Sequence, residues 1–338
     1  MISERQARLR DWLTRTLVSS DFELGPASGD ASFRRYWRVR GADRPYVVMD
    51  ASPGPEDTER FVRLAGLFRD IGLNTPRVYG CDAEHGFVLL DDLGTRHFLD
   101  VLDAGNADRL YGDALGALAV IQARGPLEGL PEYDEPFLRR ELEIFREWLL
   151  GHHLGLRPSA EDQAGIERAF DLLVQSALEQ PRVCVHRDYH ARNLMVTEPP
   201  SPGILDFQDA VIGPVTYDLV SLLRDCYIAW PPERVQSWAW GYFQRAVQSG
   251  ILRPEAEGRF ARWFDLMGAQ RHLKAAGIFA RLKVRDGKPG YLADIPRTLG
   301  YVLAIAPAYP ELASLAGLIE QRVLPALTSP PAAGPDPG

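Results

Sequence analysis

Three polar residues in one stretch of the chain, Asp188, Asn193 and Asp206, have the side-chain types that phosphoryl transfer requires. That reaction needs hard oxygen ligands for Mg²⁺ beside a nucleoside triphosphate and a carboxylate near the attacking hydroxyl. The side chains of Asn193 and Asp206 can supply the metal ligands, and Asp188 can orient a hydroxyl and accept its proton. We therefore predict a catalytic role for Asp188, a metal-binding role for Asn193 and Asp206, and ATP and Mg²⁺ as cofactors.

The sequence around these residues predicts the element that must position them. Two short apolar runs, 194–196 and 204–205, are separated by the Pro- and Gly-rich stretch 197–203, a pattern typical of a β-hairpin. Asn193 enters the first strand and Asp206 leaves the second. Strand pairing would therefore bring them side by side, although they are distant in sequence.

The spacing H-x-D-x-x-x-x-N, followed by two apolar residues and Asp-Phe, is typical of kinase catalytic and metal-binding loops. The alternative is that His186 and Asp188 only satisfy backbone groups of a turn. A chance match to this spacing in a chain of such length has a probability on the order of one per cent. We favour the functional interpretation for Asp188 and expect His186 to hold the loop by hydrogen bonds.

The order of predicted elements indicates two lobes. The 338 residues are 46% hydrophobic and 25% charged, which are ordinary globular values. Helical and strand patterns mix in the first part and helical patterns prevail afterwards. We predict helices at 3–19, 55–71, 106–123, 136–153, 161–178 and between 216 and 325, and strands at 22–24, 36–39, 46–50, 77–79 and 87–90.

The predicted fold class is accordingly α+β, a protein-kinase-like bilobal fold. Residues 1–92 would form a small, nucleotide-binding N-terminal lobe with an antiparallel sheet. Residues 93–328 would form a larger, mainly helical C-terminal lobe that carries the catalytic and acceptor-binding groups. The tail 329–338 is rich in Pro and Gly and is expected to be disordered.

Charge and cysteine content exclude several other classes of protein. The net charge of −8 argues against a nucleic-acid-binding surface, which needs a basic footprint. The three cysteines, Cys81, Cys184 and Cys226, are widely spaced, which disfavours a disulfide framework or a zinc site. The sequence shows neither a signal-peptide core nor an apolar run long enough to span a membrane. We expect a cytoplasmic protein that acts on a small molecule and needs no nucleic acid, membrane or obligate protein partner.

Two segments of the N-terminal part are candidates for nucleotide binding. Residues 28–36 lie between two predicted strands, where small residues allow backbone N–H groups to approach phosphate oxygens. The candidate phosphate-binding residues there are Ser28, Gly29, Asp30, Ala31, Ser32 and Arg34, although the same stretch also fits an ordinary turn. The segment 89–94, with Asp91 and Leu93, fits a hinge that receives adenine through backbone groups.

The third predicted strand lacks the lysine that kinases use for the α- and β-phosphates. Met49 stands at or near the expected position, and the first lysine of the chain is Lys274. Arg34 or Arg35, just after the loop, could supply the missing positive charge. Glu59 on the following helix is either a partner for one of these arginines or a solvated helix residue.

A basic stretch in the C-terminal part is a candidate acceptor site. Residues 271–288 contain six Lys or Arg against the single Asp286. In a helix, four of the cations would project within about 80° of one another: Arg271, Lys274, Arg281 and Arg285. Such a stripe favours an anionic acceptor over a cationic one such as an aminoglycoside or choline. The alternative is a solvated helix face. We predict that Arg271, His272, Lys274 and Arg281 bind substrate.

With these motifs in view, the chain up to about residue 325 resembles the aminoglycoside phosphotransferase/choline kinase superfamily, which has a protein-kinase-like fold. The segment 206–219 is similar to the family motif D-x-x-x-A-x-x-G-x-x-x-x-D-L, in which Asp218 is expected to be structural. Within the superfamily, the chain resembles the bacterial N-acetylmuramate/N-acetylglucosamine anomeric kinases. The similar segments are 29–36, 47–51, 185–189, 205–210, 270–274, 277–281 and 285–289.

This resemblance implies ATP-dependent phosphorylation of the C1 hydroxyl of N-acetylmuramate, N-acetylglucosamine or both. The product would be the α-1-phosphate, which a uridylyltransferase converts to the UDP-sugar in peptidoglycan recycling. Two alternatives remain open. One is a different small-molecule hydroxyl kinase of the superfamily, acting on an aminoglycoside, choline or homoserine. The other is a nucleotide-binding pseudokinase scaffold, suggested by the missing strand lysine.

Overall fold

The computed structural model describes residues 4–27, 34–41, 43–51 and 55–328, and the predicted tail 329–338 lies outside them. The chain divides into two compact units. The first unit comprises residues 1–130 and 186–210, and the second comprises residues 131–185 and 211–338. The predicted hairpin between Asn193 and Asp206 is therefore part of the first unit, together with the N-terminal sheet. This division differs from the expected boundary at residue 92, and the lobes 1–92 and 93–328 stay a prediction.

The first unit is built on a five-stranded antiparallel sheet with the strand order β1-β2-β3-β5-β4. The strands are β1 (Glu23–Pro26), β2 (Arg35–Arg40), β3 (Tyr46–Asp50), β4 (Val78–Asp82) and β5 (Phe87–Asp91). β3 lies at the centre, where Met49 is opposite Tyr36 on one side and Val88 on the other. The expected N-terminal antiparallel sheet is thus confirmed, and no strand end differs from its predicted position by more than three residues.

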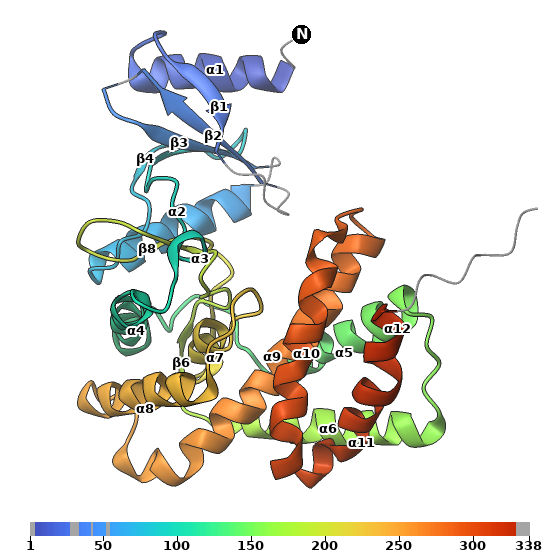
Figure 1. Ribbon diagram of the computed structural model, residues 1–338. Coiled ribbons are helices and arrows are strands. Elements are labelled where there is room, and N and C mark those ends of the chain that lie inside the picture. Colours follow the sequence, from blue (N-terminus) through green and yellow to red (C-terminus); the bar gives the residue numbers. More distant parts are fainter. Residues whose placement is uncertain (1–3, 28–33, 42, 52–54, 329–338) are drawn as a thin grey trace, which may run out of the picture. The chain divides into compact units, whose positions relative to one another are not determined.

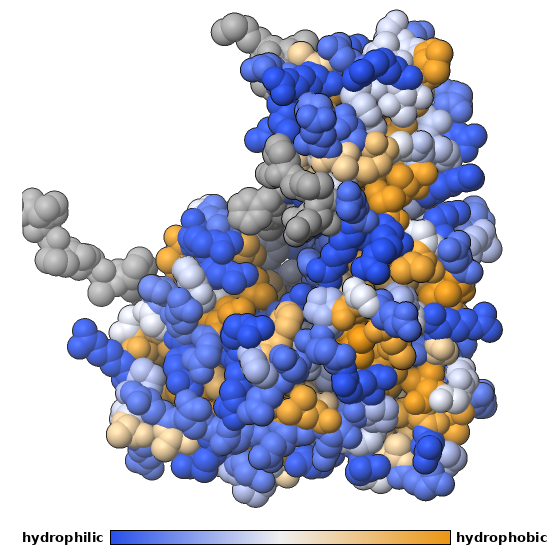
Figure 2. All heavy atoms as spheres, turned by 180° about the vertical axis from the view of Figure 1, so that it is seen from behind, coloured by the Kyte–Doolittle hydropathy of each residue, from blue (hydrophilic) through white to orange (hydrophobic). Residues whose placement is uncertain are grey.

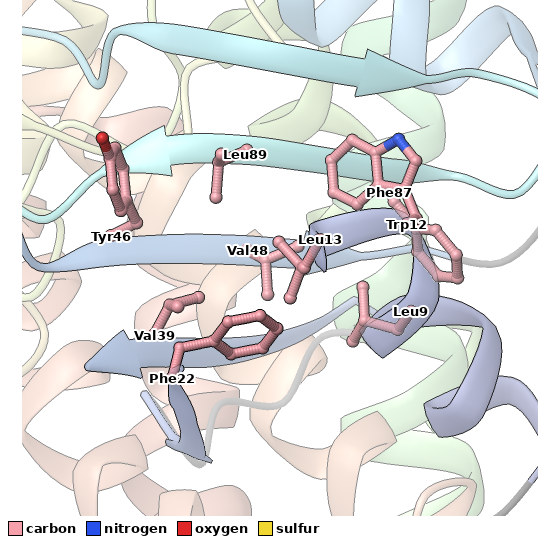
Figure 3. Close-up of a cluster of buried hydrophobic side chains, with 9 residues drawn as sticks. All are labelled: Leu9, Trp12, Leu13, Phe22, Val39, Tyr46, Val48, Phe87 and Leu89. Carbon is pink, nitrogen blue, oxygen red and sulfur yellow. The ribbon is translucent and has the colours of Figure 1, made fainter. Parts of the chain in front are cut away.

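Helix α1 (Glu4–Leu17) covers one face of this sheet (Figure 1). Its apolar residues Leu9, Trp12 and Leu13 recur at the helical period and are buried. Figure 3 shows them facing side chains from β2, β3 and β5. On β3 and β5 the cluster residues are two positions apart, because every second side chain of a strand points to the same face. The cluster also contains Phe22, Val39, Tyr46, Val48, Phe87 and Leu89.

Helix α2 (Pro55–Asp70) packs, within the first unit, against the segment that follows Asp206. Phe61 and Phe68, two turns apart on α2, both pack against the fully buried ring of Phe207. The Arg60 side chain donates a hydrogen bond to the backbone oxygen of Ala210 at 3.1 Å. Thus α2 contacts both the first and the last residue of the segment 207–210. The unit is completed by α3 (Phe98–Val101), α4 (Ala107–Arg124), β7 (Leu194–Met195) and β8 (Gly203–Ile204).

The second unit is mainly helical, and helix α9 (Glu257–Val284) is its central element (Figure 1). α9 packs against α10, α5, α6, α7 and the π-helix that continues α5. A two-stranded antiparallel pair, β6 with β9, precedes α7. The elements are α5 (Glu135–Ile144), the π-helix Phe145–His153, α6 (Ala160–Leu178), β6 (Arg182–Val185), β9 (Val211–Pro214), α7 (Tyr217–Leu223), α8 (Pro232–Gln248), α10 (Ile295–Ile305), α11 (Ala313–Leu318) and α12 (Leu324–Thr328).

The crossing of α9 over α5 depends on a glycine. A Cβ atom at Gly277 would lie 2.5 Å from the backbone carbon and oxygen of Ile144 and 2.6 Å from the backbone nitrogen of Phe145. Only a residue without a side chain lets the two backbones come this close. The contact lies where the α-helix becomes the π-helix that begins at Phe145. The glycine therefore sets how closely α9 approaches this helix.

The surface drawn in Figure 2 is mainly hydrophilic, with apolar residues interspersed among charged ones. Among the described residues, the well-exposed large hydrophobic side chains lie far apart in sequence: Val18, Leu127, Leu178 and Val284. Isolated residues of this kind are normal for a globular surface. In the described part of the chain, no helix has both the length and the apolar character that a membrane crossing requires.

Candidate active site

The predicted catalytic hairpin is present in the first unit. Leu194 pairs with Ile204 and Met195 with Gly203 in the short antiparallel pair β7–β8. Asn193 comes directly before β7, and Leu205 comes directly after β8. The Leu205 backbone N–H donates a hydrogen bond to the Asn193 carbonyl at 2.9 Å. The strand pairing therefore brings the Asn193 and Asp206 segments side by side, as the two apolar runs predicted.

Asn193 links the three predicted residues. Its Nδ2 donates a hydrogen bond to the backbone oxygen of Asp188 at 2.9 Å and lies 3.5 Å from Asp206 Oδ2. The side chain of Asn193 is buried and that of Asp188 is half-buried. Because the amide NH₂ faces these two oxygens, its own Oδ1 is the atom left to accept another ligand. The geometry brings the catalytic and metal-binding candidates into one site.

The backbone of this site adopts an uncommon conformation at two non-glycine residues. Arg187 has φ of 78° and Asp206 has φ of 63°. Left-handed conformations of this kind typically cost of order 1–3 kcal/mol and persist only where the surroundings hold them. Phe207, next to Asp206, is held by Phe61 at 5.0 Å and Phe68 at 5.8 Å between ring centroids. The aromatic packing against α2 thus holds the chain where Asp206 turns.

Negative charge accumulates around Asp206. Its side chain is accessible to water yet closely surrounded by protein. This partial desolvation, together with the nearby Asp188 and Asp209 carboxylates, raises the pKa of Asp206 to about 6, against the opposing effects of Gln208 and Arg34. A site that crowds carboxylates in this way is well suited to a bound cation.

His186 supports the loop in the neutral state. Its ring is fully buried, and burial lowers its pKa to about 4. The ring atom Nδ1 accepts a hydrogen bond from the backbone N–H of Asp188 at 3.3 Å. An uncharged histidine that fixes the Asp188 backbone agrees with the expected structural role.

The donor set fits a magnesium ion. Asp206 offers a carboxylate and Asn193 an amide oxygen, both hard ligands. In the described part of the chain, no three His, Cys, Asp or Glu side chains gather into a metal-binding cluster. Mg²⁺ does not require one, because it commonly keeps several waters and takes one or two protein ligands plus substrate phosphates.

Of the predicted nucleotide-binding residues, Ser28, Gly29, Asp30, Ala31 and Ser32 lie outside the described residues. Arg34 is half-buried and close enough to Asp206 to lower its pKa, whereas Arg35 is exposed at the start of β2. Arg34 is thus within electrostatic reach of the Asp206 carboxylate, and a phosphate contact of Arg34 or Arg35 stays a prediction. Glu59 is exposed on α2.

The hinge candidates lie at the end of β5. Asp91 Oδ1 accepts a hydrogen bond from the Arg77 backbone N–H at 2.5 Å, and burial raises the pKa of this carboxyl. Leu93 is half-buried, with its side chain close to Gly203 of β8. The Asp91 side chain is therefore engaged by the Arg77 backbone. The backbone groups of segment 89–94 remain the candidates for contact with adenine.

The position of the missing lysine is apolar. Met49 on β3 is fully buried, and the adjacent Asp50 accepts a hydrogen bond from Arg5 Nε of α1 at 2.7 Å. One strand away, Arg38 Nε donates to Asp92 Oδ2 at 2.5 Å. The carboxylates of Asp50 and Asp92 are thus each paired with an arginine.

Most of the predicted substrate residues on α9 are buried rather than exposed on a basic helix face. Arg271 is only 6% exposed, and its Nη1 lies 3.6 Å from Cys226 Sγ. His272 is fully buried and Lys274 is 7% exposed. Of the four, only Arg281 is half-buried. The alternative of a solvated helix face is therefore wrong for the first three residues, and their substrate contacts stay a prediction.

Two of these residues have clear structural partners. Nε2 of His272 lies 2.8 Å from the Arg224 backbone oxygen, and its ring stacks on Tyr301 at 4.6 Å between centroids. Burial lowers the pKa of His272 to about 3, so the ring is neutral. Lys274 Nζ forms an ion pair with Glu141 at 2.8 Å.

One residue at the site was not singled out from the sequence. Gln208 Nε2 donates a hydrogen bond to Asp206 Oδ1 at 2.7 Å. The sequence did contain a signal for Gln208. This residue follows Asp206 and Phe207, at the position where the kinase motif D-F-G has a glycine. A long amide in place of a glycine, beside a carboxylate that is predicted to bind metal, indicates a specific contact.

Comparison with known proteins agrees with this geometry. Residues 23–258 match the model of a family described as "Phosphotransferase enzyme family". The chain is 52% identical over 297 residues to an N-acetylmuramate/N-acetylglucosamine kinase of Pseudomonas aeruginosa, covering 88% of each chain. It is 41% identical over 325 residues to a kinase of the same name from Neisseria meningitidis, covering 95% of this chain and 96% of the relative.

Solved structures show the same fold at low sequence identity. The choline kinase LicA of Streptococcus pneumoniae superposes with a TM-score of 0.63 at 13% identity, covering 88% of this chain and 99% of that one. The ADP-bound aminoglycoside phosphotransferase APH(2'')-Ib superposes with a TM-score of 0.61 at 15% identity, covering 89% and 98%. These matches confirm the kinase-like fold class.

Proposed function

Because this chain belongs to the phosphotransferase enzyme family, we propose that it is a kinase that transfers the γ-phosphate of ATP to N-acetylmuramate and N-acetylglucosamine. Relatives that carry this activity in their names match nearly the whole chain at 52% and 41% identity. The observation that carries the proposal is the hydrogen bonding of Asn193 to the Asp188 backbone beside the Asp206 carboxylate. This arrangement supports an active phosphotransferase over a pseudokinase scaffold.

We place the phosphate on the C1 hydroxyl, so that the product is the sugar α-1-phosphate. An anomeric hydroxyl is more acidic than an ordinary alcohol, and Asp188 needs only to orient it and accept its proton late. Most of the acceleration would then come from positioning and from stabilising charge. The α-1-phosphate suits a following uridylyl transfer to the UDP-sugar, in peptidoglycan recycling.

Asp206 and Asn193 would hold Mg²⁺, which when bound neutralises charge on the triphosphate. Arg34 would add positive charge near the phosphates in place of the strand lysine. We retain the backbone of residues 28–32 as the phosphate-covering loop and the segment 89–94, with Asp91 and Leu93, as the adenine hinge.

For the acceptor, we propose that Arg281 binds the lactyl carboxylate of N-acetylmuramate. Burial and the neighbouring Arg285 lower the pKa of Arg281, so its guanidinium would gain from an anionic ligand. In the described part of the chain, no carboxylate forms an ion pair with Arg281, whereas Lys274 already has Glu141. We retain Arg271, His272 and Lys274 as further candidates for contact with the acceptor.

We expect this reaction to take place in the cytoplasm, where ATP is available. The three cysteines are free, and Cys184 and Cys226 are buried. Such thiols suit a reducing compartment.

An ADP-release assay tests the proposal with N-acetylmuramate, N-acetylglucosamine, kanamycin, choline and homoserine as acceptors. We expect turnover with the two amino sugars, and ¹H–³¹P correlation in the product should place the phosphate on C1. Turnover with only kanamycin, choline or homoserine would reject the substrate assignment. Asp188→Asn should lower kcat by about 10²–10⁴-fold, whereas Asp70→Asn, at an exposed site at the end of α2, should leave it unchanged.

A further inference from the structure

Gln208 is a buried amide at the active site with one hydrogen bond and one unsatisfied atom. Its side chain is 2% exposed, and Nε2 donates to Asp206 Oδ1 at 2.7 Å. Its Oε1 is buried and has no hydrogen-bond partner among the described residues. The hydrogen bond to Asp206 Oδ1 is therefore the one side-chain hydrogen bond that this amide makes to the described residues.

The orientation of the amide follows from the chemistry of its partner. An ionised carboxylate only accepts hydrogen bonds, so the NH₂ group rather than the carbonyl must face Asp206. Oδ1 of Asp206 is thereby engaged by Gln208, while Oδ2 lies 3.5 Å from Asn193 Nδ2. The two oxygens of the carboxylate thus have different surroundings, and its rotation is restricted.

A purely structural role does not explain this residue. A buried carbonyl oxygen without a partner is destabilising, and an apolar side chain of equal length would avoid that cost. The segment around Gln208 is also anchored by other means, because Phe207 packs against α2 and Arg60 binds the Ala210 carbonyl. The bond to Asp206 is what the amide adds.

We propose that Gln208 is a positioning residue that holds the Asp206 carboxylate so that Oδ2 faces the metal together with the Asn193 amide oxygen. This inference rests on the proposed kinase function. The left-handed backbone conformation of Asp206, with φ of 63°, sets the direction in which its side chain leaves the chain. The hydrogen bond from Gln208 then fixes the rotation of the carboxylate. A metal ligand held in this way needs no reorientation when the cation binds.

Gln208→Met tests the proposal, because methionine keeps the length and volume of glutamine but cannot donate a hydrogen bond. Mn²⁺ would be titrated into the full-length protein with a non-hydrolysable ATP analogue and followed by electron paramagnetic resonance. We expect the Mn²⁺ dissociation constant to rise by about 10–100-fold, the typical effect of losing a partner of a metal ligand. The Tm should be unchanged or higher, because the unsatisfied oxygen is also removed.

Gln122→Met in α4 is the matched control, since Gln122 is another glutamine of the first unit and only 7% exposed. It should leave Mn²⁺ affinity unchanged. Gln208→Asn, whose amide is one methylene too short, should also weaken Mn²⁺ binding, and it decides the matter if the methionine variant does not fold. Wild-type affinity in the folded Gln208 variants would overturn the positioning role alone. Failure of the wild-type protein to bind Mn²⁺ with nucleotide would overturn the metal site of the proposed function.

Discussion

Lys274 Nζ lies 2.8 Å from Glu141 Oε1 in the interior of the second unit, with side-chain exposures of only 9% and 5%. Lys274 also donates to Tyr217 Oη at 2.9 Å. The second carboxylate oxygen of Glu141 accepts from Tyr133 Oη, which in turn accepts from Gln270 Nε2 at 3.2 Å. This network connects α5, α7 and α9, and it balances the charge of a lysine that the sequence analysis assigned to a basic, substrate-binding stripe.

Lys274→Met should lower the free energy of unfolding by about 3–5 kcal/mol, because it leaves the Glu141 carboxylate buried without a counter-charge. The double variant Lys274→Met/Glu141→Leu should recover most of that loss, since it removes both charges. Urea unfolding of the wild-type protein and the two variants measures these differences. A double variant that is less stable than Lys274→Met would contradict the buried-pair interpretation.

Arg281→Gln should raise the KM for N-acetylmuramate by about 10–100-fold, in line with a lost hydrogen bond between charged groups. The KM for N-acetylglucosamine should stay near the wild-type value, because this sugar lacks the lactyl carboxylate. The neutral sugar therefore serves as the internal control for folding and for ATP binding. Equal increases for both sugars would show that Arg281 does not recognise the carboxylate.

Arg34→Ala should raise the KM for ATP by about 10-fold or more, because it removes a positive charge beside the expected phosphate site. Arg35→Ala is the matched control and should have little effect, since Arg35 is exposed while Arg34 lies within electrostatic reach of Asp206. ADP release at varied ATP and saturating sugar measures both. Unchanged values for Arg34→Ala would remove it as the replacement for the strand lysine.

Gly277→Ala should destabilise the protein by about 1–3 kcal/mol, the usual cost of overpacking. The new Cβ would meet the Ile144 backbone at 2.5 Å, and a backbone cannot move aside as a flexible side chain can. Gly241→Ala, within α8, has open space around the new Cβ and should instead stabilise by about 0.4–1 kcal/mol. Thermal or urea unfolding of the two variants should therefore change in opposite directions.

His272 should make stability depend on pH under mildly acidic conditions. Its pKa falls from an ordinary 6.5 to about 3 in the folded protein, so between these values only the unfolded chain binds the proton. The stabilising contribution is complete above pH 6.5 and is lost progressively as the pH falls toward 3, by up to about 1.4 kcal/mol per pH unit.

His272→Gln removes this titration, so its unfolding free energy should fall less steeply than that of the wild-type protein between pH 6.5 and 4.5. The remaining slope includes His186, which is buried, has a lowered pKa and is present in both proteins. Urea unfolding at several pH values gives the two slopes. Parallel slopes would mean that His272 is protonated in the folded state.

Local sequence patterns were sufficient for much of the architecture. Apolar residues at the helical period predicted α1, and alternation at residues 36–39 predicted β2. The strand predicted at 46–50 coincides with β3. The Pro- and Gly-rich turn between two apolar runs predicted the hairpin that brings Asn193 and Asp206 together. These features depend on contacts between residues close in sequence, which is why a single sequence can indicate them.

The environment of each charged side chain could not be obtained in the same way. The basic pattern on α9 was visible, but not that Arg271, His272 and Lys274 are buried. Their burial depends on α5, α7 and α10, which pack around α9 from distant parts of the chain. The sequence likewise contained Gln208 without revealing which oxygen its amide binds.

The sequence by itself therefore determined the types of residue available for phosphoryl transfer, their spacing and the hairpin that presents them. Only the tertiary structure decided which charges are paired, which histidines are neutral and how the Asp206 carboxylate is held. The physical reason is that residue type and local backbone preference act over a few neighbouring residues, whereas desolvation and ion pairing depend on every group that packs nearby.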